Sequence, residues 1–234
     1  MAYQQNSNNI TQAVKFAFGY FTVLPVKSGY FEANKEFYKT VVFTLPLVGF
    51  VLALIVVASY EFVFTHTIYS AFICSLFYIF LTGFLHLEAV ADTIDGWYAS
   101  FGKKDIYEVM HEPQIGSIGA VATFCITLLQ IASLMYCLYE QYYLVIFLSF
   151  VLSRFGVYFA LIFDFHKKSI FINEMKNAIT FNTVLKIVFF PLNIVVNLIL
   201  NILKNRLGFL NGDTLGFMIV VVEIIVLNTG IVLC

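Results

Sequence analysis

Residues 68–96 read IYSAFICSLFYIFLTGFLHLEAVADTIDG, an apolar run that ends in three closely spaced carboxylates. A helix needs roughly 20 predominantly apolar residues to cross a bilayer, so Ile68–Ala91 predicts a membrane span with an acidic end. The same apolar signal recurs on either side of this stretch. Four further spans are predicted at Val41–Tyr60, Ile118–Leu138, Tyr142–Phe163 and Thr214–Cys234.

The composition fits a chain that is largely surrounded by a lipid bilayer. Hydrophobic residues make up 61% of the 234 residues and charged residues 12%, and the mean hydropathy is +0.89. A soluble domain carries about 45–50% apolar and about 25% charged residues. The predicted fold is therefore an all-α, polytopic integral membrane helix bundle, a single domain over residues 1–234 with about six membrane segments.

Two segments do not read as simple spans. Residues 183–203 contain Lys186, Pro191 and asparagines at every fourth position, and they predict either a full crossing or a re-entrant segment bent at the proline. A full crossing would place Asp213 outside, whereas a re-entrant segment keeps it on the cytosolic side, which we favour. Residues 1–40 predict a cytosolic or interfacial N-terminal segment.

The lysine distribution predicts orientation, because cytoplasmic loops are enriched in lysine and arginine. The lysine-containing segments are 1–40, 92–117 and 164–182, and the loops without lysine or arginine are 61–67 and 139–141. The prediction is a multi-pass protein of the cell inner membrane whose acidic loop 92–117 carries an active site on the cytosolic face. The net charge of −1 argues against nucleic-acid binding, which needs a strongly basic face.

The carboxylates at the end of the second predicted span form a ridge. At about 100° per residue, the side chains of Glu88, Asp92 and Asp95 point within roughly 60° of one another on a helix. No lysine or arginine lies three or four residues away, and a helix C-terminus disfavours anions. A cation from outside the chain is the simplest partner, and oxygen ligands favour magnesium, calcium or manganese. The alternative is a solvated helix end that pairs with Lys103 and Lys104.

A second acidic set follows in the same loop. The spacing of Asp105, Glu108 and Glu112 predicts one face of a short helix that ends at Pro113. This face is either a solvated surface or a complement to the first ridge, which would create a two-metal or metal-plus-base arrangement for phosphoryl chemistry.

Other residues are candidates for substrate contacts. Gly116 and Gly119 would let the backbone approach a phosphate or a neighbouring helix. Arg154 lies in the middle of a predicted span, where an arginine needs a partner: either a phosphate or an internal acid such as Glu223. His86 lies two residues before the ridge and is predicted to hydrogen-bond to it or to a substrate. Lys103 and Lys104 are the basic candidates for a substrate phosphate.

Five sequence blocks resemble the cobalamin synthase family, in the same order along the chain. GFLHLEAVADTIDGW (83–97) is similar to the family signature G-x-L-H-L-D-G-L-A-D-T-x-D-G, and DIYEVMHEPQIGSIGA (105–120) is similar to E-I-M-x-D-S-x-I-G-x-x-G. The late motif G-D-x-x-G resembles NGDTLG (211–216). Weaker similarity covers FGYFTVLPV (18–26) and VVFTLPLVGF (41–50).

The chain departs from the family pattern at two places. The first aspartate of the signature is Glu88, followed by Ala89 instead of glycine, and the D-S-R of the second block is Glu112-Pro113-Gln114. Each Asp-to-Glu change keeps the charge but shifts the oxygens by one methylene. The missing arginine at Gln114 puts a phosphate-clamping role there in doubt.

The resemblance implies an adenosylcobinamide-GDP ribazoletransferase. Such an enzyme joins α-ribazole, or its 5′-phosphate, to GDP-activated adenosylcobinamide and releases GMP in cobalamin biosynthesis. The resemblance also implies Mg²⁺ on the pyrophosphate, and a monomer and an oligomer are both compatible with it. The implied metal ligands are Glu88, Asp92, Asp95 and Asp213, and the implied further ligand or general base is Glu112 or Glu108.

Two other functions remain as alternatives. A CDP-alcohol phosphotransferase also uses aspartates at a helix end, but the D-G-x-x-A-R continuation of that family is absent after Gly96. A cation transporter would also use carboxylates, although transporters place such sites near the middle of the membrane.

Overall fold

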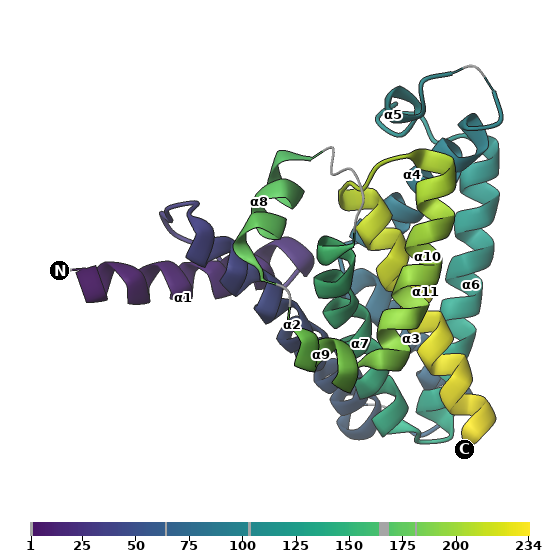
Figure 1. Ribbon diagram of the computed structural model, residues 1–234. Helices are drawn as coiled ribbons and strands as arrows, with labels where there is room; N and C mark the ends of the chain where they lie inside the picture. Colours follow the sequence, from purple (N-terminus) through teal and green to yellow (C-terminus); the bar gives the residue numbers. More distant parts are fainter. Residues whose placement is uncertain (1, 64, 103, 164–168, 181) are drawn as a thin grey trace.

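The computed structural model describes residues 2–63, 65–102, 104–163, 169–180 and 182–234, and short connections join helices throughout these residues (Figure 1). The helices are α1 (Ala2–Phe21), α2 (Lys35–Phe62), α3 (Ile68–Leu81), α4 (Leu85–Ala99), α5 (Ile106–Val109), α6 (Ser117–Tyr139), α7 (Tyr143–Ile162), α8 (Ile170–Ala178), α9 (Thr183–Val188), α10 (Phe190–Leu207) and α11 (Gly212–Leu233).

Several helices are long and apolar enough to cross a membrane. In the described part of the chain these are α2, α6, α7 and α11, and a fifth crossing results if α3 and α4 form one broken span. These four helices overlap closely with four of the spans predicted from the sequence. The predicted multi-pass helical bundle is therefore confirmed.

The prediction of one continuous helix over Ile68–Ala91 is wrong. The chain breaks between α3 and α4, and the two helices are bent by 76°. Gly83 and Phe84 both adopt positive φ angles, 62° and 59°, which end a right-handed helix. The backbone N–H of Val23 donates a 2.9 Å hydrogen bond to the Leu81 carbonyl at this break. The bend turns the acidic helix α4 away from the direction of α3.

The connections between the long helices lie at two ends of the bundle. Figure 1 shows the α4–α6 connection with α5, and the turn between α10 and α11, at the upper end. The α6–α7 turn and the end of α11 lie at the lower end. Helix α1 runs across the bundle direction and projects to the side, where α2 contacts both α1 and α8. The interfacial position of residues 1–40 stays a prediction.

Residues 183–203 do not form one straight span. A break at Phe189 separates α9 from α10, and Pro191 follows in the first turn of α10, where a missing N–H costs little. Helix α10 ends near the C-terminal end of α4. There the Arg206 guanidinium lies 4.4 Å from the centre of the ring of Phe101, which follows α4 by two residues. Asp213, which follows α10, lies near the acidic helix, and the choice between a full crossing and a re-entrant segment stays a prediction.

Two glycines let neighbouring helices approach closely. A Cβ atom at Gly49 of α2 would collide with the Phe150 carbonyl of α7. A Cβ atom at Gly216 of α11 would lie 2.5 Å from the Cβ of Ala89 in α4. Because real Cβ atoms do not come this near, both contacts depend on glycine. The second contact fixes α11 against the acidic helix and so determines the geometry of the candidate site.

Candidate active site

Helices α4 and α11 bring three carboxylates into one pocket. The close contact at Gly216 places the first turn of α11, with Asp213, next to Glu88 and Asp92 of α4. Asn211 caps α11 by accepting a 3.0 Å hydrogen bond from the Thr214 N–H, and its amide donates a 2.7 Å bond to Asp213. Asp213 is thus oriented by its own helix cap.

The sequence-based view of Glu88 as a residue near a helix C-terminus is wrong. Because the span breaks at Gly83 and Phe84, Glu88 lies in the first turn of α4, and Asp213 lies in the first turn of α11. Helix N-termini carry about half a positive charge and favour anions. Two helix N-termini are therefore directed toward the same pocket, which favours binding of an anionic group such as a phosphate.

The pocket that these residues line has a volume of about 910 Å³ and is open on one side. Its walls are α4, residues 110–115, one face of α6 and the start of α11. Carboxylates and apolar side chains line it together: Glu88, Asp92, Glu112 and Asp213 are the acids, and Phe84, Leu87 and Phe124 are among the apolar residues.

The carboxylates repel one another. Asp92 feels the charges of Asp213, Glu88 and Asp95, while a protonated His111 would attract both Asp92 and Asp213. None of the described lysines and arginines forms an ion pair with Glu88, Asp92 or Asp213. Within the described residues, the alternative of a ridge neutralised by protein lysines is therefore not seen.

Asp95 does not share this pocket with the other two ridge residues. Its two carboxylate oxygens accept hydrogen bonds from the Gly116 N–H at 2.7 Å and the Gly119 N–H at 2.9 Å. The side chain therefore caps the N-terminus of α6 from a neighbouring helix. The predicted common face of Glu88, Asp92 and Asp95 is divided, because α6 packs against the end of α4 and engages only Asp95.

The roles predicted for Gly116 and Gly119 change accordingly. A Cβ atom at either position would come within 3.0 Å of the Asp95 carboxylate. Of the two alternatives raised by the sequence, the close approach of a neighbouring helix is the one observed. These glycines hold the α4–α6 corner together, and they do not present a phosphate cradle.

The second acidic ridge is not a helical face. Helix α5 has only four residues, and Asp105 caps it by accepting hydrogen bonds from the N–H groups of Tyr107 and Glu108. The Glu108 side chain is exposed and lines none of the pockets described here, whereas Glu112 lies after the helix and lines the acidic pocket. Of the two proposed bases, only Glu112 is near the other carboxylates.

The basic candidates of this loop lie on a different side. Lys104 is exposed and lines a neighbouring pocket of about 480 Å³, together with Asp95 and Glu112. Lys103 lies outside the described residues. Glu112 lines both pockets, so a ligand that extends from the acidic pocket toward Lys104 would pass this carboxylate.

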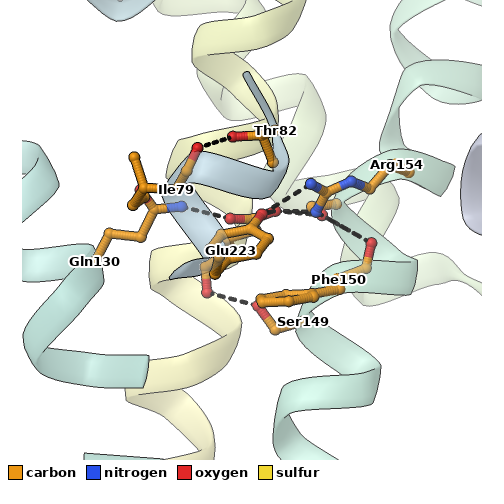
Figure 2. A network of polar contacts seen from close by, with 9 residues as sticks. Ile79, Thr82, Gln130, Ser149, Phe150, Arg154 and Glu223 are labelled. Carbon is orange, nitrogen blue, oxygen red and sulfur yellow. Dashed lines mark hydrogen bonds and ion pairs between the residues drawn. The ribbon is translucent and has the colours of Figure 1, made fainter. Parts of the chain in front are cut away.

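Arg154 has an internal partner. Figure 2 shows its guanidinium directed at Glu223, with which it forms an ion pair. It also donates a 2.8 Å hydrogen bond to the hydroxyl of Tyr78, which itself donates to Glu223 at 2.6 Å. Gln130 donates to the second Glu223 oxygen at 2.5 Å. The ion pair with Glu223 is the alternative observed, and a substrate-binding role for Arg154 has no support in the structure.

His86 is buried close to the carboxylates but does not line the acidic pocket. It lines a second cavity of about 120 Å³ that Glu88 and Asp213 also border. Its Nδ1 atom is buried and has no hydrogen-bond partner among the described residues. The predicted contact of His86 with the ridge is therefore not formed in this structure, and a contact with substrate stays a prediction.

Three further residues of the acidic pocket were not predicted. His111 lies beside Glu112 and donates a 2.8 Å hydrogen bond from Nδ1 to the Tyr107 carbonyl. Thr123 and Thr127 line the pocket from α6. Their four-residue spacing in an otherwise apolar span is a signal that could have identified them as one polar face.

The donor set fits a magnesium ion that is held mainly by substrate and water. Among the described residues, no three acidic, histidine or cysteine side chains converge closely enough to enclose a metal. Magnesium usually keeps several waters and uses one or two carboxylates plus substrate phosphates. An open pocket with three carboxylates that pair with no described lysine or arginine supplies such ligands, whereas it would not make a closed protein cage.

Comparisons with known proteins agree on one family. A family model described as Cobalamin-5-phosphate synthase matches residues 13–231. A protein of Clostridium botulinum (strain Langeland) named adenosylcobinamide-GDP ribazoletransferase is 28% identical over 221 residues, which cover 84% of this chain and 88% of that protein. A Treponema denticola protein of the same name is 36% identical over 106 residues, which cover 45% of this chain and 40% of that protein. No solved structure matches this chain.

Proposed function

The chain belongs to the cobalamin-5-phosphate synthase family, and from this membership we propose that its acidic pocket joins α-ribazole, or its 5′-phosphate, to adenosylcobinamide-GDP. It is a transferase of cobalamin biosynthesis that acts on a substituted phosphate group. In the proposed reaction, an acceptor oxygen attacks the phosphorus that carries cobinamide. The bond from this phosphorus to the bridging oxygen breaks, and GMP leaves with that oxygen.

One observation carries this proposal: Glu88, Asp92 and Asp213 line an open pocket, and no lysine or arginine in the described part of the chain forms an ion pair with them. A diphosphate substrate is itself anionic, so it binds to such a pocket only together with cations. The two helix N-termini at the pocket favour the phosphate oxygens as well. A volume of about 910 Å³ lies within the range of about 300–1,000 Å³ that is usual for ligand pockets.

We propose that Glu88, Asp92 and Asp213 hold Mg²⁺ at the diphosphate. When bound, the ion would neutralise the diphosphate and stabilise the charge that develops on the leaving phosphate. The side chains orient the substrate by fixing where this charge can be neutralised. Asp95 has a positioning role, because its bonds to Gly116 and Gly119 set the distance between α4 and α6.

Glu112 is the proposed general base. It borders the acidic pocket from the loop before α6 and is exposed, so it can accept a proton from an acceptor hydroxyl and pass it to water. His111, which borders the same pocket, is placed to stabilise the negative charge of nearby carboxylates when protonated. Whether the acceptor is α-ribazole or its 5′-phosphate, the attacking group is a hydroxyl of the acceptor, so a base is needed in both cases.

We propose that the protein resides in the inner membrane, with the acidic pocket on the cytosolic face. The lysines of residues 1–40, 92–117 and 164–182 support this orientation through the enrichment of lysine in cytoplasmic loops. Nucleotide-activated substrates are also made in the cytosol, so a pocket on this face meets them directly.

The test is a turnover assay in proteoliposomes with adenosylcobinamide-GDP and α-ribazole. GMP and the corrinoid product should form in equal amounts and only with a divalent cation. Asp92→Asn should reduce both products at least about 100-fold, because it removes a charge at the diphosphate. Glu140→Gln is the matched control, since this exposed acid lies in the α6–α7 turn, away from the pocket.

Two results would contradict the proposal. Unchanged turnover by folded Asp92→Asn protein would remove the carboxylates from the mechanism. Absence of both products from folded wild-type protein would refute the reaction itself, and CDP-alcohols and ion flux would then be the next substrates and activities to measure.

A further inference from the structure

The lining of the acidic pocket includes two threonines that the proposed reaction has not used. Thr123 and Thr127 lie one turn apart on the same face of α6, and both line the pocket. The Oγ1 atoms of both residues are buried and have no hydrogen-bond partner among the described residues. A helical threonine usually bonds to the carbonyl three or four residues before it, and buried hydroxyl groups are generally paired.

The pocket that these threonines line also has apolar and aromatic residues. Phe84 at the α3–α4 break, Leu87 of α4 and Phe124 of α6 line the same pocket. Phe84 and Phe124 are 52% and 64% exposed, so the described protein covers less than half of each residue. A flat apolar group with few polar atoms would match this part of the pocket better than a charged group would.

The position along α6 separates this part from the phosphate chemistry. Glu112, which lines the pocket, precedes α6, so Gly119 in the first turn of α6 lies at the end of the helix nearer to this carboxylate. Thr127 lies two turns further along the helix, at roughly 12 Å by the rise of an α-helix. A nucleoside is of similar length, so a ligand with its base at Thr127 places its ribose toward the carboxylates.

We infer that Thr123 and Thr127 bind the acceptor nucleoside, with its benzimidazole base against Phe84 and Phe124. This inference rests on the proposed function. A benzimidazole is a flat apolar ring with one unsubstituted nitrogen, which accepts a hydrogen bond from the Thr127 hydroxyl. Thr123, one turn closer to the carboxylates, donates to the ribose. Both orphan hydroxyls thereby gain a partner when the acceptor binds.

The corrinoid substrate is a poor occupant of this part of the pocket. A corrin ring carries several amide side chains, each with donors and acceptors that would be left unpaired among Phe84, Leu87 and Phe124. The two threonines offer only two hydroxyl groups for them. The corrinoid of the donor therefore lies toward the open side of the pocket, and the base of the acceptor lies inside.

The test measures acceptor binding separately from turnover. Dissociation constants for α-ribazole are measured by the fluorescence of its benzimidazole, with the purified protein in nanodiscs and without the corrinoid donor. Thr127→Val keeps the size of the side chain and should weaken binding about tenfold, because a paired hydroxyl is lost. Thr127→Ser keeps the hydroxyl and should bind α-ribazole within about twofold of wild type.

The matched control is Thr93→Val. The Thr93 hydroxyl of α4 is also buried without a partner among the described residues, but Thr93 does not line the pocket. The same substitution there should leave the dissociation constant unchanged. In steady-state turnover, Thr123→Val and Thr127→Val should raise the KM for α-ribazole and leave the KM for the donor unchanged.

Two outcomes would overturn the inference. One is an unchanged α-ribazole dissociation constant in the folded Thr123→Val/Thr127→Val double variant. The other is a rise in the donor KM alone, which would assign this part of the pocket to the corrinoid. Neither outcome affects the proposed reaction, which fails if folded wild-type protein forms no GMP and no corrinoid product.

Discussion

Replacing Glu223 by leucine should lower the free energy of unfolding by about 3–5 kcal/mol, the usual effect of removing one partner from a buried ion pair. The Glu223 side chain is completely buried and accepts hydrogen bonds from Tyr78, Gln130 and Arg154 (Figure 2). These residues come from α3, α6 and α7, so the carboxylate connects α11 to three other helices. Its loss leaves a guanidinium, a hydroxyl and an amide in an apolar interior.

The assay is thermal unfolding of the protein in lipid nanodiscs. For a chain of about this length, 1 kcal/mol shifts the Tm by about 2–4 °C, so Glu223→Leu should lower the Tm by about 6–20 °C. The double variant Arg154→Met/Glu223→Leu should recover most of this loss, because no charge is left unpaired. It should stay somewhat below wild type, since the donors of Tyr78 and Gln130 keep no acceptor.

Glu140→Gln serves as the control and should melt like wild type, because Glu140 is an exposed acid in the turn after α6. A Glu223→Leu protein with the wild-type Tm would refute the structural role of the pair. A double variant that melts below the single variant would also refute it. Turnover per folded molecule separates this role from a catalytic one, and it should remain measurable in both variants below their melting temperatures.

Three further outcomes follow from the site geometry. Gly216→Val should reduce turnover about 100-fold, because the added side chain forces α11 away from α4 and displaces Asp213. Gly212→Ala should leave turnover nearly unchanged, because a Cβ there meets open space, and equal activity of the two variants would contradict this reasoning. Asp95→Ala should lower the free energy of unfolding by about 0.5–2 kcal/mol through loss of the α6 cap, and the Tm falls with it. Asp92→Asn removes a charge that the neighbouring carboxylates repel and should not lower the Tm, as differential scanning fluorimetry would show. EDTA should abolish GMP release and added Mg²⁺ should restore it; persistent turnover in EDTA would exclude a divalent cation.

The helices themselves follow from the sequence because lipid leaves few choices. A run of about 20 apolar residues must satisfy its backbone internally, so the four uninterrupted spans were predicted, and α6, α7 and α11 nearly to their ends. The start of α2 at Lys35 was missed, because its first turns are polar. The break at Gly83 and Phe84 was missed because no proline marks it, and a lone glycine inside an apolar run is a weak signal. Its consequence is large, since it moves Glu88 from the end of one helix to the start of another.

The candidate site was predicted in its composition more than in its geometry. Glu88, Asp92 and Asp213 lie together as expected, although they come from distant parts of the chain. Asp95 was misassigned because helical spacing shows which residues share a face but not which neighbour covers that face. The pairing of Arg154 with Glu223 was left open for the same reason: 69 residues separate them, and only the packing of α7 against α11 decides it.

The position of Glu223 and Asp213 on α11 also bears on how the protein is made. During synthesis, α7 enters the membrane with Arg154 before its partner carboxylate has been translated, so the arginine must remain hydrated or near the membrane surface for a time. Insertion of α11 supplies this carboxylate and, with the same helix, Asp213 for the acidic pocket. The step that neutralises the buried arginine in the nascent chain is thus also the step that completes the carboxylate set, and a ribosome-bound chain that lacks α11 has neither.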